Sequence, residues 1–164
     1  MSTLIPNENC WIGFSDVFPA AADTLVPTVA EVAAAVELTD FIISLTANAQ
    51  GNAVPTPKLK SMFETSIPGT NTATFTAEMY RDSVQEDDLA WNTLPRNAYG
   101  VFYISRFGGT GADLLPVATD HVEVWPVRVI SRAASPMSSN TAQTFTLTCS
   151  VPQEPNEDAI IGGP

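Results

Sequence analysis

Two stretches of the chain alternate polar and apolar residues, and this alternation constrains the fold more than any other feature of the sequence. In residues 72–80 the polar members are Thr72, Thr74, Thr76 and Glu78. Residues 142–151 repeat the pattern, with threonines alternating with larger apolar residues. Because successive side chains of a strand point to opposite faces, both stretches are predicted to be half-buried strands with a threonine-rich wet face.

Other segments predict further strands and two helices. Strands are expected at residues 99–107 and 121–130, and shorter ones at 10–14, 41–46 and 58–63. Pro126 within the second of these implies an edge position or a bulge. Loops are expected at residues 48–57, 67–71, 108–120 and 131–141, where small, polar and turn-forming residues gather.

Two capping-box spacings mark the predicted helices. Thr28 and Glu31 open a short amphipathic helix within residues 26–38, and Ser83 and Glu86 open a second one that Pro95 ends. Glu86, Asp87 and Asp88 would then lie in the first turn, at the positive end of the helix dipole. We therefore expect a single mainly β, largely antiparallel domain over residues 1–164 with one or two helices packed on it. Residues 152–164 read as an extended or mobile tail.

The charge balance narrows the possible functions. The chain of 164 residues has 18 acidic and 7 basic residues, a net charge of -11, although charged residues make up only 15% of it. Such a chain can neutralise few phosphates, so tight binding to nucleic acid or an anionic membrane is not expected. No apolar run approaches the roughly 20 residues of a membrane helix, and residues 1–14 lack the pattern of a secretion signal.

No catalytic, cofactor or metal site is predicted. His121 is the one histidine, and no nucleophile motif surrounds it. The acidic triplet at residues 86–88 could be a metal or glycosidase set, but neighbouring helical positions diverge, and a helix start explains it better. The glycines of the segment 108–111 lack the lysine of a phosphate loop.

The tryptophans and cysteines favour packing over chemistry. Trp11, Trp91 and Trp125 share no spacing, and core or subunit packing is the expected use of Trp125. Cys10 and Cys149 lie near opposite ends of the chain and are expected to be reduced core residues, with their state left open. The residues alone therefore point to a structural or binding protein.

The chain as a whole resembles the major tail (tail tube) proteins of long-tailed bacteriophages that infect actinobacteria. The resemblance is carried by VPTVAEVAAAVELTDFI, by PGTNTATFTAEMYRDSVQEDDLAWNTLPRNAYGVFYISRFGG, by HVEVWPVRVISRA and by SSNTAQTFTLTCSVPQEPNEDAIIG, in this order along nearly the whole chain. It implies an antiparallel β-sandwich flanked by a helix, closing into a β-barrel when six copies form a ring. Stacked rings would make a virion tube for DNA ejection, assembled in the host cytoplasm, with no catalytic residues to carry over.

The resemblance also implies partners and surfaces. Tape-measure, tail terminator and distal tail proteins would contact the tube, and DNA would pass through it without specific binding. The hypothetical bore-lining residues are Thr72, Thr74, Thr76 and Glu78. The hypothetical inter-subunit or inter-ring loops contain Asn52, Pro55, Gly109 and Asp113. Inward-facing acidic groups would keep a passing polyanion from adhering.

Two rival functions stay open from the sequence. A monomeric β-sandwich binding module, of adhesin or carbohydrate-binding type, could use Trp11, Trp91 or the loop 108–120. An enzyme could use Glu86, Asp87 or Asp88 with a metal ion.

Overall fold

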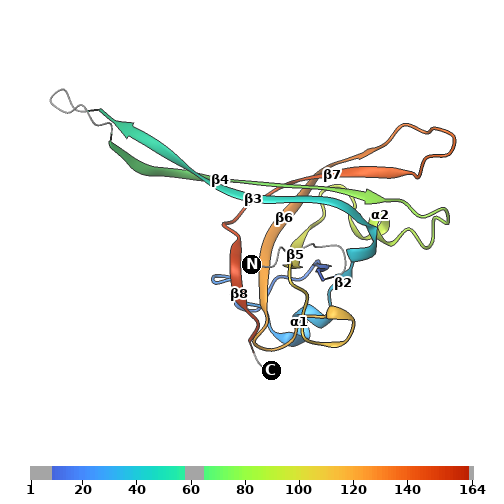
Figure 1. Ribbon diagram of the computed structural model, residues 1–164, viewed down its shortest axis with the longest axis horizontal. Coiled ribbons are helices and arrows are strands. Elements are labelled where there is room, and N and C mark those ends of the chain that lie inside the picture. Colours follow the sequence, from blue (N-terminus) through green and yellow to red (C-terminus); the bar gives the residue numbers. More distant parts are fainter. Residues whose placement is uncertain (1–8, 58–64, 163–164) are drawn as a thin grey trace, which may run out of the picture.

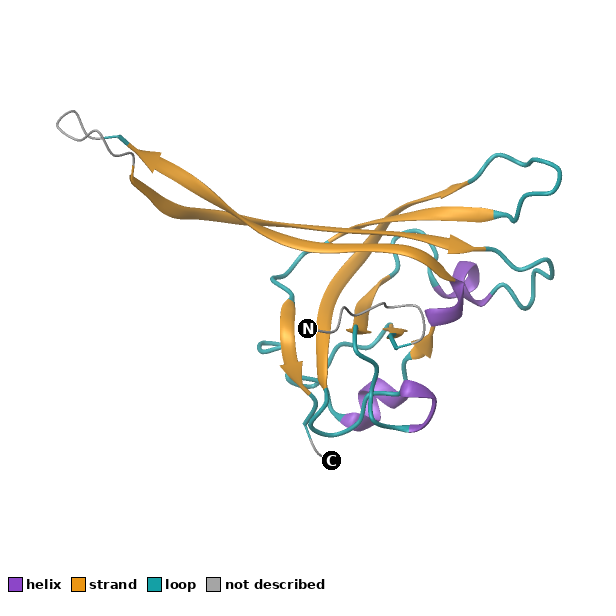
Figure 2. Cartoon of the chain, viewed as in Figure 1, coloured by secondary structure: helices purple, strands orange, loops and turns teal. Residues whose placement is uncertain are grey.

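The computed structural model describes residues 9–57 and 65–162. Figures 1 and 2 show a body of strands and short helical segments, from which one long hairpin projects. The strands are β1 (Trp11–Ser15), β2 (Val36–Glu37), β3 (Ile42–Thr56), β4 (Thr65–Tyr80), β5 (Tyr99–Ser105), β6 (His121–Ala134), β7 (Thr144–Ser150) and β8 (Asn156–Ile160). The helices are α1 (Val29–Ala33) and α2 (Leu89–Thr93), with 3-10 turns η1 (Thr39–Phe41) and η2 (Ala112–Leu114).

The strands form one antiparallel sheet that curls over itself. Its order is β2-β1-β5-β6-β7-β4-β3, and β8 pairs with β6 beside this path. Strands β4 and β5 are three steps apart, about 14 Å in a flat sheet. Yet the ring centroids of Phe75 on β4 and Phe102 on β5 are 4.7 Å apart. The two ends of the sheet therefore face each other, which gives the expected antiparallel sandwich, open in a single copy.

Two apolar clusters lie on the two faces of the strands β1, β5 and β6. The larger one fills the inside of the curl, where Phe75 and Trp125 are fully buried. The smaller one lies on the opposite face of the same strands and is closed by α1 and β8 through Val32 and Ala159. Because both faces of β5 are covered, all its residues except Tyr99 are buried.

The predicted alternation is confirmed in both strands that carry it. In β4, Phe75, Ala77 and Met79 are buried. Thr72 and Thr74 are exposed, and Thr76 and Glu78 are half-buried on the other face. In β7 the buried positions are Phe145, Leu147 and Cys149.

Only the first of the two predicted helix starts is correct. Thr28 and Glu31 form the complete capping box of α1, although the chain turns into β2 from Val36. The second helix is shorter than predicted, since α2 begins at Leu89 and its N-cap residue, Asp88, makes no side-chain capping bond. Ser83 and Glu86 lie in the preceding loop, so the dipole explanation of the acidic triplet is wrong. The carboxylate of Asp88 pairs instead with Arg81 on the core side, at 2.7 Å.

Two predicted loops are strands. Residues 48–56 and 67–71 belong to β3 and β4, which pair from Ile42 to Thr56 with register shifts between Ile42 and Ser44 and between Gly51 and Ala53. Prolines are tolerated there because Pro55 and Pro68 lie where each strand has only the other as partner, so a missing N–H breaks no second ladder. The strand expected at residues 58–63 lies outside the described residues.

The C-terminal segment is not a free tail. Asn156–Ile160 form β8, which pairs with β6, and Ala159 and Ile161 are 1% exposed. Ala159 and Ile161 pack in the smaller apolar cluster. Their acidic and polar neighbours in the sequence did not indicate that they would be buried. Pro126 is at a local edge, as predicted, because β8 pairs with β6 up to Val124 and β7 pairs with it only from Arg128.

Candidate assembly surfaces

The inner side of the curled sheet packs against the larger apolar cluster. The outer side carries a polar layer that we name the hydroxyl face. It spans β3, β4, β7 and the C-terminal half of β6, which lie along the top of the view in Figure 1. No member is buried. Cross-strand pairing places Ala133, opposite Thr146, on this side of the sheet, together with the polar members Ser44, Thr46, Asn48, Gln50, Thr72, Thr74, Thr76, Glu78, Arg128, Ser131, Thr146, Thr148 and Ser150.

The hydroxyl face is almost uncharged. Its one carboxylate, Glu78, is matched by one guanidinium, Arg128, and the rest are hydroxyls and amides. The acidic residues that give the chain its net charge lie mainly elsewhere, for example at Asp23 and Glu157 near β8. The hydroxyl face therefore does not carry the net acidity of the chain among the described residues.

The four strands beneath the hydroxyl face end in two unpaired edges. β3 is the last strand of the sheet, so its outer backbone groups have no strand partner in the described chain. On the other side, β6 pairs with β5 only up to Arg128, and Val129 still bonds to Asn97 and Ala98. Beyond Val129, β6 pairs only with β7 within the described residues. Long unpaired edges invite pairing with another chain.

The outer half of the β3–β4 hairpin, residues 50–56 and 65–71, is named the arm. β7 pairs with β4 only from Phe75 to Tyr80, so the arm is a two-stranded ribbon that extends away from the body (Figure 1). Asn52 lies opposite Gly69 and Thr70 at a register shift whose extra residue is on β4, and Pro55 pairs with Ser66, so both Asn52 and Pro55 lie in a strand rather than in a loop. The arm has no charged side chain, and Val54 and Ile67 face each other with 47% and 54% of their surface exposed.

The β5–β6 loop is folded onto itself. A Cβ atom on Gly109 would stand 2.2 Å from the carbonyl oxygen of Leu115, so this glycine permits a close approach within the loop. The carboxylate of Asp120 accepts hydrogen bonds from the backbone N–H of Thr110 and of Val117, at 2.8 and 2.9 Å. Burial alone would raise the pKa of Asp120, but these bonds lower it below its usual value. Asp113, which has a positive φ of 53°, is exposed.

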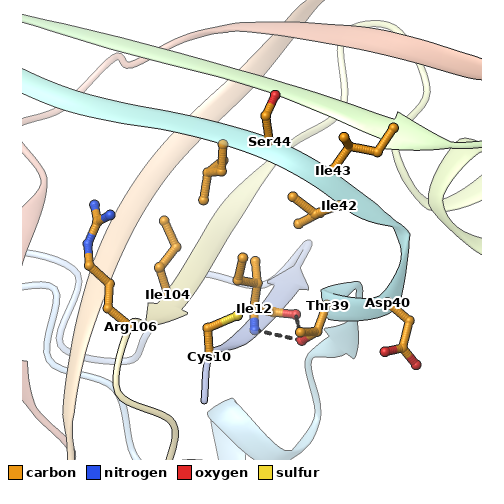
Figure 3. A pocket seen from close by; sticks show the side chains of 10 residues that line it. Cys10, Ile12, Thr39, Asp40, Ile42, Ile43, Ser44, Ile104 and Arg106 are labelled. Atoms are coloured by element: carbon orange, nitrogen blue, oxygen red, sulfur yellow. Dashed lines mark hydrogen bonds between the residues drawn. The ribbon is translucent and has the colours of Figure 1, made fainter. Parts of the chain in front are cut away.

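A groove of about 620 Å³ runs between the start of β3 and the strands β1 and β5. Figure 3 shows Ile12, Ile42 and Ile104 pointing toward one another across it. Thr39 closes one wall by accepting a hydrogen bond from the N–H of Ile12 at 2.9 Å. The exposed carboxylate of Asp40 lies at the rim. The curled sheet does not close on itself. The groove is the gap between β3 at one end of the sheet and β1 and β5 toward the other end.

A cluster of guanidinium groups surrounds Trp91 on α2. The central carbon atoms of Arg81 and Arg132 each lie 4.0 Å from the Trp91 ring centroid. Arg132 also donates a hydrogen bond to the Trp91 carbonyl at 2.7 Å. Burial lowers the pKa of Arg132, and the charges of Arg96 and Arg81 lower it further, while Asp88 acts in the opposite direction. We name Arg81, Trp91, Arg96 and Arg132 the arginine corner.

The candidate catalytic residues do not converge. Asp88 is buried beside Arg81, while Glu86 and Asp87 are exposed in the loop before α2. His121 bonds through Nδ1 to Asp158, and both side chains are mostly exposed. In residues 9–57 and 65–162, no three His, Cys, Asp or Glu side chains gather as metal ligands. Among the described helices none has the length and apolarity needed to cross a membrane.

The tryptophans are placed for packing rather than for ligand stacking. Trp11 and Trp125 are 2% and 0% exposed, and two guanidinium groups lie over the ring of Trp91. Cys149 is buried, and burial raises the pKa of its thiol to about 12, while Cys10 lines the groove. Both cysteines are free thiols, and the predicted core role holds for Cys149.

Comparisons with known proteins agree with this geometry. A family model described as phage tail tube protein matches residues 16–164. No curated protein matches the sequence.

Three solved structures share the fold at low sequence identity. A chain of the virion of a native gene transfer agent particle is 10% identical, with a TM-score of 0.57, over 92% of this chain and 95% of that one. A chain of the tail of an empty gene transfer agent particle with C6 symmetry is 12% identical, with a TM-score of 0.54, over 76% and 87%. A chain of the sixfold-symmetrised baseplate of the anti-feeding prophage is 10% identical, with a TM-score of 0.53, over 94% and 95%.

Proposed function

The chain belongs to the phage tail tube protein family, and we propose that it builds the tube as stacked rings of six copies joined through their free strand edges. The observation that carries this proposal is the pair of unpaired edges on the four-stranded sheet beneath the hydroxyl face. Sixfold symmetry in the descriptions of two similar structures supports the number of copies.

Strand direction supports the ring. Neighbouring strands in the order β6, β7, β4, β3 are antiparallel, so the two edge strands run in opposite directions. When β3 of one copy meets β6 of the next, the new pair is antiparallel like all the others. A heterologous contact of this kind closes into a ring when its rotation fits.

The hydroxyl face is proposed to line the bore. Six copies of the four-stranded sheet would make a 24-stranded barrel, with strands about 4.8 Å apart and tilted by about 40°. The backbone diameter is then about 45–50 Å. Thr72, Thr74, Thr76 and Glu78 would face the passing DNA with hydroxyls and few charges. A surface with so few cations gives phosphates little to bind, and the net acidity lies outside the bore as a solubility feature.

The remaining surfaces have proposed roles in the same assembly. The arm, including Asn52 and Pro55, would reach a neighbouring subunit or ring, and the loop with Gly109 and Asp113 would contact another. Tape-measure, terminator and distal tail proteins are the proposed partners, and host cytoplasm is the proposed place of assembly. We assign no enzymatic role. Phages of actinobacteria remain a prediction from the sequence resemblance.

Thiol labelling of assembled tubes tests the bore assignment. Thr76→Cys on the hydroxyl face is compared with Ala30→Cys on α1, which lies on the far side of the body (Figure 1), both in a Cys10→Ser, Cys149→Ser background. In tubes verified by electron microscopy, we expect a maleimide on a large polymer to modify the α1 thiol and to spare the thiol at position 76. Equal labelling of both would contradict a bore-lining hydroxyl face, and an absence of rings would contradict the proposed function.

A further inference from the structure

We infer that the groove between β3 and the strands β1 and β5 is the seat for the arginine corner of the next copy in the ring. This inference rests on the proposed ring and names the side chains that would join its subunits. Its occupant is a second copy of this chain.

Strand register places the two surfaces at the same end of the sheet. Ile42 at the start of β3 pairs with Met79 near the end of β4. Tyr80 pairs with Thr144 at the start of β7, and Phe145 pairs with Ala134 at the end of β6. The start of β3 and the end of β6 therefore lie at one end. Edge-to-edge pairing sets the end of β6 of one copy beside the start of β3 of the next.

Both surfaces also lie on the core side of the sheet. The groove is on that side of β3, where Ile42 faces Ile12 and Ile104 (Figure 3). Trp91 packs edge-on against Phe145, a buried residue of β7, with ring centroids 5.1 Å apart. When the two edges pair, α2 of the next copy is brought alongside the mouth of the groove.

Charge complementarity favours this contact. Two charged residues line the groove: Arg106 is paired with Glu123, whereas Asp40 at the rim is exposed and makes no ion pair among the described residues. The arginine corner holds three guanidinium groups against one buried carboxylate, Asp88. The exposed carboxylates Asp82, Glu86 and Asp87 lie in the loop before α2 of the same copy and oppose this attraction, so the proposed contact is with the guanidinium groups themselves. An ion pair that loses its water at an interface contributes more to the free energy of assembly than an exposed ion pair contributes to the stability of one copy.

Apolar complementarity supports it as well. Ile43 at the groove and Leu89 at the start of α2 are 42% and 41% exposed, so each presents apolar surface that the neighbouring copy would cover. Burying such surface at an interface is favourable in proportion to its area. The contact would thus combine an apolar centre with a charged rim, as specific interfaces do.

A charge swap between two exposed positions tests the pairing. Asp40→Arg and Arg96→Asp each place like charges across the interface, and we expect each to raise the protein concentration needed for ring assembly at least about tenfold. The double variant restores the opposite pair and is expected to recover most of the assembly. Because both side chains are exposed, the unfolding midpoint of the monomer should not change. Asp23→Arg, an equal charge change in the loop before α1, is the matched control and should assemble like the wild type.

The outcomes separate the two proposals. If the wild type forms no rings, the proposed function fails. If wild-type rings form and Asp40→Arg assembles equally well, the ring stands and this interface is wrong. If both single variants block assembly and the double variant does not recover it, the pairing of Asp40 with the arginine corner is overturned.

Discussion

The body and the arm are built from the same kind of antiparallel strand, yet they differ in what stabilises them. In the body, β5 has a strand on each side and apolar clusters on both faces, so nearly all its residues are buried. In the arm, each strand has a single partner and most side chains are exposed. A two-stranded ribbon alone is marginally stable in water. The body supplies most of the stability of one copy, and the arm leaves most of its surface exposed.

The largest difference between the two regions is expected from truncating an apolar residue in each. Phe75→Ala removes a ring that is 0% exposed and stacks on Phe102. We expect it to lower the free energy of unfolding by about 3–5 kcal/mol. Ile67→Ala on the arm should change it by less than about 0.5 kcal/mol. Urea denaturation of the unassembled protein measures both, and equal losses would show that the arm is packed like the body.

Acidification should separate the regions by a smaller amount. Burial alone would raise the pKa of Glu31, but bonds from the backbone N–H groups of Thr28 and Ala20 lower it below 4.5, and the pKa of Asp120 is lowered below 3.8. Groups with a lowered pKa stabilise the fold above their ordinary pKa, and this stability is lost as the pH falls through the folded value. The arm has no carboxylate, so this loss of stability on acidification is expected to come from the body.

The measurement is the free energy of unfolding of unassembled protein between pH 7 and pH 3. A Glu31→Gln, Asp120→Asn variant is less stable at pH 7 and should show a smaller loss on acidification than the wild type. Parallel pH profiles for the two proteins would mean that neither carboxylate contributes.

The smallest effect on the single copy is expected from removing the arm. Replacing residues 51–71 by Asn-Gly joins Gln50 to Thr72 through a two-residue turn, and these two residues already pair. Because the arm contributes little to either apolar cluster, we expect the free energy of unfolding to change by less than about 1 kcal/mol. Long tubes should be lost in electron micrographs. Normal tubes from this variant would show that assembly does not need the arm.

Local patterns predicted the parts of the fold that depend on neighbouring residues in the chain. The alternation in residues 72–80 predicted which side of β4 is buried, and the spacing of Thr28 and Glu31 predicted the cap of α1. The same spacing at Ser83 and Glu86 failed, since α2 begins only at Leu89 and the buried carboxylate of Asp88 pairs with Arg81. The candidate bore residues were predicted as a set, whereas the groove and the arginine corner were not.

The sequence by itself determined a mainly antiparallel β protein with a threonine-rich face and one well-capped helix, since strand alternation and capping are short-range effects. Only the tertiary structure decided that residues 50–56 and 65–71 form an arm, because strands rich in proline, glycine and asparagine depend on pairing with each other. It also decided that β8 joins the body and that the acidity lies off the hydroxyl face. Those outcomes arise from contacts between residues far apart in the chain, which no local pattern records.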